Sequence, residues 1–118
     1  MPTDQTVKNF FEVFNARDMD RMAELLHEDA ELYFPKTQPL IGKDRILKFL
    51  NILFRQYPEL TFQVQRIICE GSQAAIHWTN KGRSRKNEPY QNEGATILEM
   101  VDDEITFISD FFKDTEKF

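Results

Sequence analysis

Asp110 is the residue of this sequence whose type and surroundings best suit chemistry. It alternates with Ile108 and Phe112, so a strand through this segment would hold its carboxylate on an apolar face. Burial disfavours the charged form of a carboxyl group, and the pKa of Asp110 should therefore rise. A carboxylate tuned in this way can take a proton from carbon or give one to a leaving oxygen. In a second interpretation Asp110 only hydrogen-bonds a polar neighbour, such as Thr96 or the Trp78 indole, and polarises a binding pocket.

The two histidines and the single cysteine do not indicate a catalytic or metal site. His27 is expected at the end of a helix, where a cation suits the helix dipole. His77 alternates with Ile76 and Trp78 and is predicted to point outward. Metal sites normally need several clustered ligands, so we predict no metal site. Cys69 is expected to be a small core or strand residue. Because no nucleotide-binding fingerprint is present either, we expect no cofactor.

A basic cluster occupies the end of a predicted hairpin and consists of Lys81, Arg83, Arg85 and Lys86. Such a cluster usually belongs to a solvated loop. Alternatively, it contacts an anionic group of a ligand or partner.

Three helices are predicted in the first half of the chain. Thr3 or Asp4 can cap the first helix, which breaks at residues 15–17. Asp18 can cap a second helix that ends around residues 27–29, and Pro58 ends the third. The apolar faces have helical spacing and consist of Val7, Phe10, Phe11 and Phe14; of Met19, Met22, Leu25 and Leu26; and of Ile46, Phe49, Leu50, Leu53 and Phe54.

The hydrophobic period changes to two in the second half. It predicts strands over residues 62–69, 74–83, 90–101 and 105–112, after one short strand at 30–34. Residues 70–73 and 102–103 are predicted turns, and residues 37–42 a loop. Helices followed by a strand meander indicate an α+β fold, with the three N-terminal helices covering one face of an antiparallel sheet.

The composition describes one domain over residues 1–118, long enough to bury one core. Hydrophobic residues make up 41% of the chain, and its eleven phenylalanines suit a dry core or a dry pocket. The net charge of −5 argues against nucleic acid as a partner. A single cysteine precludes an internal disulfide, and we expect neither a secretory signal nor a membrane span, because no apolar stretch approaches ~20 residues. We therefore expect a cytoplasmic protein.

Six short segments resemble the SnoaL-like branch of the nuclear-transport-factor-2-like superfamily, which also contains ketosteroid isomerase. They are FNARD (14–18), DAEL (29–32), IGKDRI (41–46), IHWT (76–79), NEG (92–94) and SDFFKDT (109–115). The resemblance implies a cone, in which a strongly curved antiparallel sheet, an α+β barrel, wraps around the helices and is open at one end. It also implies a homodimer formed through the outer face of the sheet.

The same resemblance implies which side chains line the cone. Inward positions would be Ile76, Trp78 and Asn80; Asn92, Gly94, Thr96, Leu98 and Met100; and Ile108, Asp110 and Phe112. Outward positions would include Ile67 and Ile97. The residues expected to bind a small apolar ligand are Phe10, Phe14, Tyr33, Phe34, Phe49, Trp78, Asn92, Thr96, Leu98, Ile108 and Phe112, with Tyr33 and Tyr90 near the mouth. Asp110 matches an acid/base position of SnoaL-like cyclases.

The sequence departs from the better-known relatives at their catalytic positions. Phe34 stands where ketosteroid isomerase has its base, and Phe10 and Thr96 stand at its two oxyanion-binding positions. Of the Asp-Arg-Asp set of limonene-epoxide hydrolases, only the second acid, Asp110, is found. The resemblance therefore argues against ketosteroid isomerisation.

Three functions remain open from the sequence. The first is a cofactor-independent isomerase, cyclase, hydratase or lyase that uses Asp110 as general acid/base. The second is a protein that binds a small hydrophobic ligand without chemistry. The third is a dimeric scaffold subunit.

Overall fold

The chain forms three helices and six strands over residues 2–115, the part that this computed structural model describes. The helices are α1 (Asp4–Ala16), α2 (Met19–Leu25) and α3 (Lys43–Gln56). The strands are β1 (Leu26–Tyr33), β2 (Leu40–Ile41), β3 (Thr61–Glu70), β4 (Gln73–Arg83), β5 (Pro89–Val101) and β6 (Glu104–Phe112). None of these three helices is long and apolar enough to cross a membrane.

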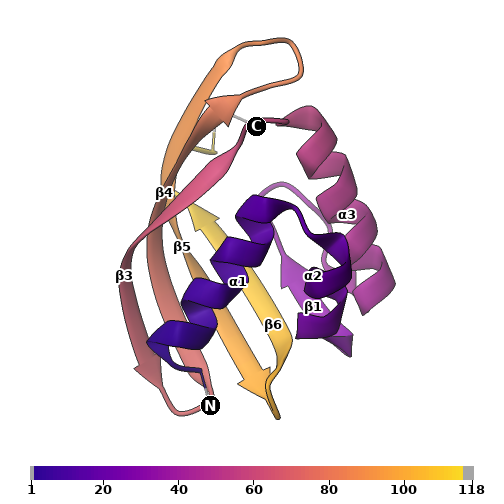
Figure 1. Ribbon diagram of the computed structural model, residues 1–118, viewed down its shortest axis with the longest axis vertical. Helices are drawn as coiled ribbons and strands as arrows, with labels where there is room; N and C mark the ends of the chain where they lie inside the picture. The colour runs from indigo at the N-terminus through magenta and orange to yellow at the C-terminus, as the bar shows by residue number, and fades with distance from the viewer. Residues whose placement is uncertain (1, 116–118) are drawn as a thin grey trace.

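All six strands join one sheet in the order β2-β1-β6-β5-β4-β3. β1 runs parallel to β6, whereas every other pair of neighbours is antiparallel. The prediction of an antiparallel sheet is therefore wrong at β1, where the long connection through α3 and three strands permits parallel pairing. β2 and β3 form the two edges, so the sheet is open and not a closed barrel. Figure 1 shows β3, β4 and β5 curving past α1.

A capping side chain begins the first helix, and a residue with left-handed backbone conformation ends it. Thr3 caps α1 in a reciprocal pair of hydrogen bonds with Thr6. The helix stops where Arg17 adopts φ 58° and ψ 33°. Just before this break, Asn15 donates to the Phe62 carbonyl (2.8 Å) and accepts from the Phe62 amide (2.9 Å). Asn15 therefore ties the end of α1 to β3.

Arg17 ties the same break to the end of α3. Its guanidinium donates to the carbonyls of Phe54, Tyr57 and Leu60 at 2.8–3.1 Å and lies over the Phe54 ring. The last carbonyls of a helix have no partner within the helix, and here one side chain provides it. The FNARD segment is thus a structural joint between α1, α3 and β3.

The second helix is shorter than predicted. Asp18 caps it as expected. Leu26, however, already belongs to β1, where it pairs with Ile105 of β6. His27 consequently lies in a strand and not at a helix end, and its Nδ1 accepts from the Asp29 amide (3.0 Å). Met22 and Leu26 have helical spacing and are both buried, although Met22 lies in α2 and Leu26 in β1. The hydrophobic pattern therefore does not reveal where the helix ends. Residues 40–41 of the predicted loop form β2.

A β-bulge in β3 changes which of its side chains face inward. Val64 pairs with Trp78, whereas Arg66, two residues on, pairs with His77, so one extra residue enters the strand. Beyond the bulge Ile67 lies opposite the buried Ile76 and packs against the core. The prediction that Ile67 points outward is therefore wrong, because a bulge shifts the alternation by one residue.

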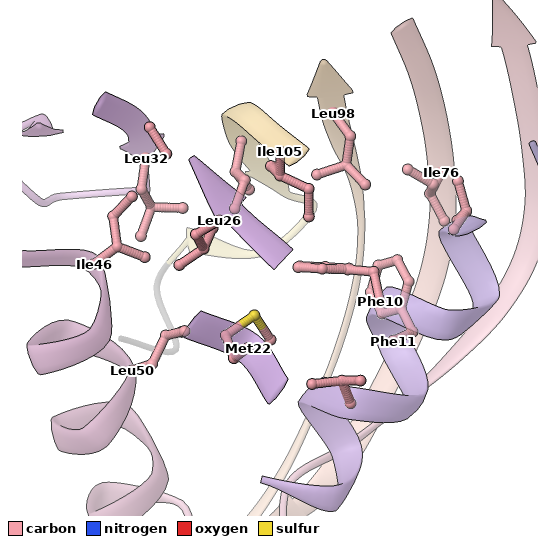
Figure 2. Packing of buried hydrophobic residues seen from close by; sticks show 14 of the residues in the cluster. Phe10, Phe11, Met22, Leu26, Leu32, Ile46, Leu50, Ile76, Leu98 and Ile105 are labelled. Carbon is pink, nitrogen blue, oxygen red and sulfur yellow. The ribbon is translucent and has the colours of Figure 1, made fainter. Parts of the chain in front are cut away.

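The core fills the space between the helices and the inner face of the sheet. In Figure 2, Phe10 and Phe11 of α1 face Ile76 and Leu98 on the sheet. On the other side Ile46 and Leu50 of α3 face β1, and Met22 of α2 lies between the two groups. The helices therefore hold a shared apolar interior against the strands that carry the candidate site.

Candidate functional site

Asp110 lies at the end of a short chain of hydrogen bonds across three strands. The strand register places Asp110 of β6 opposite Thr96 of β5. The Trp78 indole donates to the Thr96 hydroxyl (2.8 Å), and this hydroxyl donates to Oδ1 of Asp110 (2.6 Å). An indole N–H can only donate, so the Thr96 proton is directed to Asp110. Trp78 and Thr96 are fully buried, and the chain therefore fixes the orientation of the carboxylate.

The surroundings of Asp110 raise its pKa to about 6, mainly because burial removes water from the charged form. The hydrogen bond from Thr96 acts in the opposite direction and lowers the pKa. Although the residue as a whole keeps some exposed surface, apolar atoms crowd its carboxyl group. Oδ2 takes part in no hydrogen bond within residues 2–115. One carboxylate oxygen is thus anchored and the other is available.

A cavity of about 40 Å³ lies beside this carboxylate. Its wall is almost entirely apolar, and Thr96, Asp110 and two tyrosines are its polar members. A water molecule needs roughly 10–15 Å³ by this type of measure, so the cavity has room for about three. Drug-sized ligands occupy cavities of roughly 300–1,000 Å³. A larger ligand would therefore have to displace side chains of the wall.

The structure brings eight of the twelve predicted site residues to this cavity. They are Phe10, Phe14, Phe34, Phe49, Thr96, Ile108, Asp110 and Phe112.

Four predicted residues lie elsewhere. Trp78 and Leu98 face inward but are packed in the sheet behind the wall. Asn92 is held by the chain itself, because its Nδ2 donates to the Asp114 carbonyl (2.8 Å) and to the Tyr90 hydroxyl (3.3 Å). Tyr33 lies on the opposite face of β1 from Leu32, where its hydroxyl donates to Glu31.

The wall also contains residues that the sequence analysis did not assign to a site. Tyr57, Leu60 and Phe62 follow α3 and line the cavity. Tyr90, expected near the mouth, lies against Tyr57 with ring centroids 5.0 Å apart, and burial raises its pKa to about 12. The signal in the sequence was the alternation of Leu60 and Phe62 at the start of β3, which places both on one face.

The other candidate groups do not join Asp110. His77 lies on the outer face, where its Nε2 pairs with Glu93 at 2.5 Å, and Cys69 is exposed. Among residues 2–115, no three His, Cys, Asp or Glu side chains gather as metal ligands would. Of the basic cluster, Arg85 and Lys86 line a surface groove of about 750 Å³. That groove adjoins the cavity, because Tyr57 and Tyr90 line both.

Replacing Thr96 by valine should raise the pKa of Asp110 further above about 6. The substitution removes the hydrogen bond that lowers this pKa and leaves the Trp78 indole without its acceptor. We also expect the unfolding free energy to fall by about 1–3 kcal/mol, the cost of an unpaired buried donor. A carboxyl-carbon NMR titration measures the pKa, with Thr96→Ser as the control that keeps the hydroxyl. An unchanged or lower pKa in Thr96→Val would show that Thr96 does not act on Asp110.

Comparison with known proteins identifies the family. The sequence profile described as "SnoaL-like domain" matches residues 7–108. An NTF2-like protein of unknown function from Exiguobacterium sp. 255-15 is 17% identical, with 92% of this chain and 98% of that chain covered and a TM-score of 0.84. A proposed SnoaL-like polyketide cyclase from Jannaschia sp. CCS1 is 18% identical, with 92% and 83% covered and a TM-score of 0.83. At these identities both structures show a shared fold.

A curated relative matches a shorter stretch. The orange carotenoid-binding protein of Synechocystis sp. (strain ATCC 27184 / PCC 6803 / Kazusa) is 38% identical over 49 residues, which are 42% of this chain. The match spans 16% of the length of that relative. The profile match, in contrast, extends over most of the chain, from α1 to β6, and includes the strands that carry Trp78 and Thr96. The chain therefore belongs to the SnoaL-like domain family.

Proposed function

We propose that this protein binds a small, mostly apolar molecule and acts on it with Asp110 as general acid/base. The observation that carries the proposal is an oriented carboxylate with one available oxygen on an otherwise apolar cavity wall. The reaction class is a cofactor-independent isomerisation, cyclisation, hydration or elimination. The fold similarity to a proposed polyketide cyclase is compatible with this class.

The pKa of Asp110 suits proton transfer near neutral pH. With a pKa of about 6, roughly nine in ten Asp110 side chains carry a charge at pH 7 and can accept a proton. The protonated acid so formed is strong enough to return the proton at a second atom. Acid/base groups work best when their pKa lies near the working pH. Thr96 and Trp78 would hold Oδ1 while Oδ2 exchanges the proton.

Proton exchange tests this function before the natural substrate is known. Small ketones and β-diketones in D₂O lose the NMR signal of the hydrogen next to the carbonyl when a base removes it. We expect the wild-type protein to accelerate this loss for at least one probe, and Asp110→Asn to be slower by roughly 10²–10⁴-fold. The rate should rise with pH and level off above about 6, the pKa of Asp110. Equal rates for both proteins would exclude the general-base role.

A second candidate is binding without chemistry, and the match to the orange carotenoid-binding protein favours it. A carotenoid has a far larger volume than the cavity of about 40 Å³, so binding would require the wall to open. Purification from carotenoid-producing cells provides the test. Unaltered pigment that co-purifies in a fixed ratio to the protein would support this candidate, whereas colourless protein under the same conditions would count against it.

We also propose that the protein forms a homodimer through the outer face of the sheet. The proposed location is the cytoplasm. Ile68 and Phe111 are 67% and 58% exposed on this face, and Ile97 lies between their strands. Exposed apolar groups on a sheet are typical of an interface. Light scattering that gives twice the chain mass of 14.0 kDa would support the dimer, and a mass equal to that of one chain would refute it.

A further inference from the structure

Asn80 of β4 is a buried polar side chain whose hydrogen bonds are not made. It is 4% exposed, and neither its Nδ2 nor its Oδ1 has a partner in the part of the chain that the structure describes. It shares the inner face of β4 with Trp78, two residues before it. A buried amide normally finds partners, since leaving it unpaired is costly. This side chain therefore requires a partner that residues 2–115 do not supply.

The neighbouring strands do not supply that partner. The register places Asn80 between Asn92 of β5 and Phe62 of β3. The Asn92 side chain is occupied, because it donates to Asp114 and Tyr90 and accepts from the amides of Glu93 and Asp114. Phe62 offers only a ring. Asn80 thus differs from Asn92, which has the same residue type and the same inner face but a structural role.

Asn80 lies directly behind the end of the cavity that faces the surface groove. Phe62, its partner across β3, lines the cavity. Tyr90 lies opposite Gly82, the next inward position on β4, and lines both the cavity and the groove together with Tyr57. Tyr57 and Tyr90, whose ring centroids lie 5.0 Å apart, thus stand between the groove of about 750 Å³ and the cavity of about 40 Å³. A ligand that displaces these rings and the Phe62 ring would reach Asn80, which itself lines a separate surface groove of about 650 Å³ together with Phe62 and Asn92.

We propose that Asn80 is a ligand-recognition residue: a ligand enters between Tyr57 and Tyr90, and its polar end binds the free carboxamide of Asn80. The inference rests on the proposed function of the cavity and adds the chemistry of the ligand. Because both Nδ2 and Oδ1 are free, the matching group both donates and accepts a hydrogen bond, as a hydroxyl or a carboxamide does. The rest of the molecule is apolar, like the wall.

The strand geometry also sets where this group lies relative to Asp110. Asp110 is opposite Thr96, which pairs with Ile76, and Asn80 is four residues further along β4. At ~3.3 Å per residue this separation along the strand is about 13 Å. The polar group would therefore lie at the far end of the ligand from the atom that exchanges a proton with Asp110.

A matched pair of probes tests the inference. 2-Naphthol and 2-methylnaphthalene have nearly the same shape, and the first carries a hydroxyl where the second carries a methyl group. We expect the wild-type protein to bind 2-naphthol at least tenfold more tightly in a fluorescence titration, and Asn80→Leu to lose this preference. The side-chain amide NMR signals of Asn80 should shift on addition of 2-naphthol and not of 2-methylnaphthalene. Asn80→Thr, which keeps a donor and an acceptor, should retain part of the preference.

Thermal unfolding without any probe separates recognition from structure. Asn80→Leu removes an unpaired buried amide, so we expect its melting temperature to rise by several degrees. A lower melting temperature with an unchanged probe preference would mean that Asn80 is structural, held for example by an internal water, and would overturn the inference. If both probes bind but their preference does not depend on Asn80, the inference fails while the proposed cavity function stands. If neither probe binds the wild-type protein, both fail.

Discussion

Asp110→Asn should raise the unfolding free energy at pH 7 by up to about 3 kcal/mol, although it removes the proposed catalytic group. The pKa of Asp110 is about 6 in the folded chain against an ordinary value of 3.8, and each pKa unit corresponds to about 1.4 kcal/mol. Between these two pH values the folded state binds a proton that the unfolded state has released. The free energy of unfolding therefore falls as the pH rises from about 4 to 6. Asparagine carries no charge and avoids this cost.

Urea unfolding of both proteins between pH 3.5 and 8 provides the measurement. The advantage of Asp110→Asn should be small below pH 4, should grow through the window and should be constant above about pH 6.5. Asp103→Asn is a matched control, because this exposed turn residue has a φ of 66° that asparagine tolerates, and no buried charge is removed. A pH-independent difference, or a variant less stable than the wild type at pH 7, would contradict the assignment of a desolvated carboxylate.

If Asp110→Asn gains stability and also loses the acceleration of proton exchange, both changes would have one physical cause. A carboxylate that accepts protons at neutral pH is one that the fold does not solvate well, so its charge costs stability. A structural carboxylate shows the opposite pattern, since its partners stabilise the charge and its loss weakens the fold. The sign of the stability change thus separates a desolvated carboxylate from one whose charge the fold stabilises, and the proton-exchange rates then distinguish a general base from a group that only polarises the pocket.

The parts of the fold that the sequence predicted are those set by local pattern. Alternation, together with the family resemblance that identified the inner side, placed Asp110, Thr96 and Trp78 on one inner face, and the register confirms that they share a face. Of the two candidate caps Thr3 and Asp4, Thr3 caps α1, and Asp18 caps α2 as predicted. Each of these signals depends on side chains a few residues apart, which a single sequence displays directly.

The errors arose where distant segments decide the outcome. Leu26 joins a strand rather than α2 because β6 is available to pair with it. The bulge in β3 turned Ile67 inward, and the residue types at positions 64–66 do not predict a bulge. Tyr33 is a different case, because it was assigned to the ligand site although alternation with Leu32, a local signal, carries it to the outer face. The free state of Asn80 also depends on what Asn92 and Phe62 do, which alternation alone does not reveal.

Gly94→Ala should be a highly damaging single-methyl change, with an unfolding free energy lower by about 3 kcal/mol or more. A Cβ at Gly94 would lie 2.8 Å from both Cζ2 and Cη2 of Trp78 and would also collide with the backbone carbonyl of Phe111. Neither neighbour can move aside. Trp78 is fully buried and its indole is bonded to Thr96, while Phe111 belongs to the β6 ladder.

Gly71→Ala is the control that separates this collision from the general cost of replacing glycine. Nothing lies within 4 Å of a Cβ at Gly71, but its φ of 60° disfavours alanine by roughly 1–2 kcal/mol. Urea unfolding should therefore rank the wild type above Gly71→Ala and Gly71→Ala above Gly94→Ala. A Gly94→Ala protein as stable as Gly71→Ala would mean that Trp78 can shift.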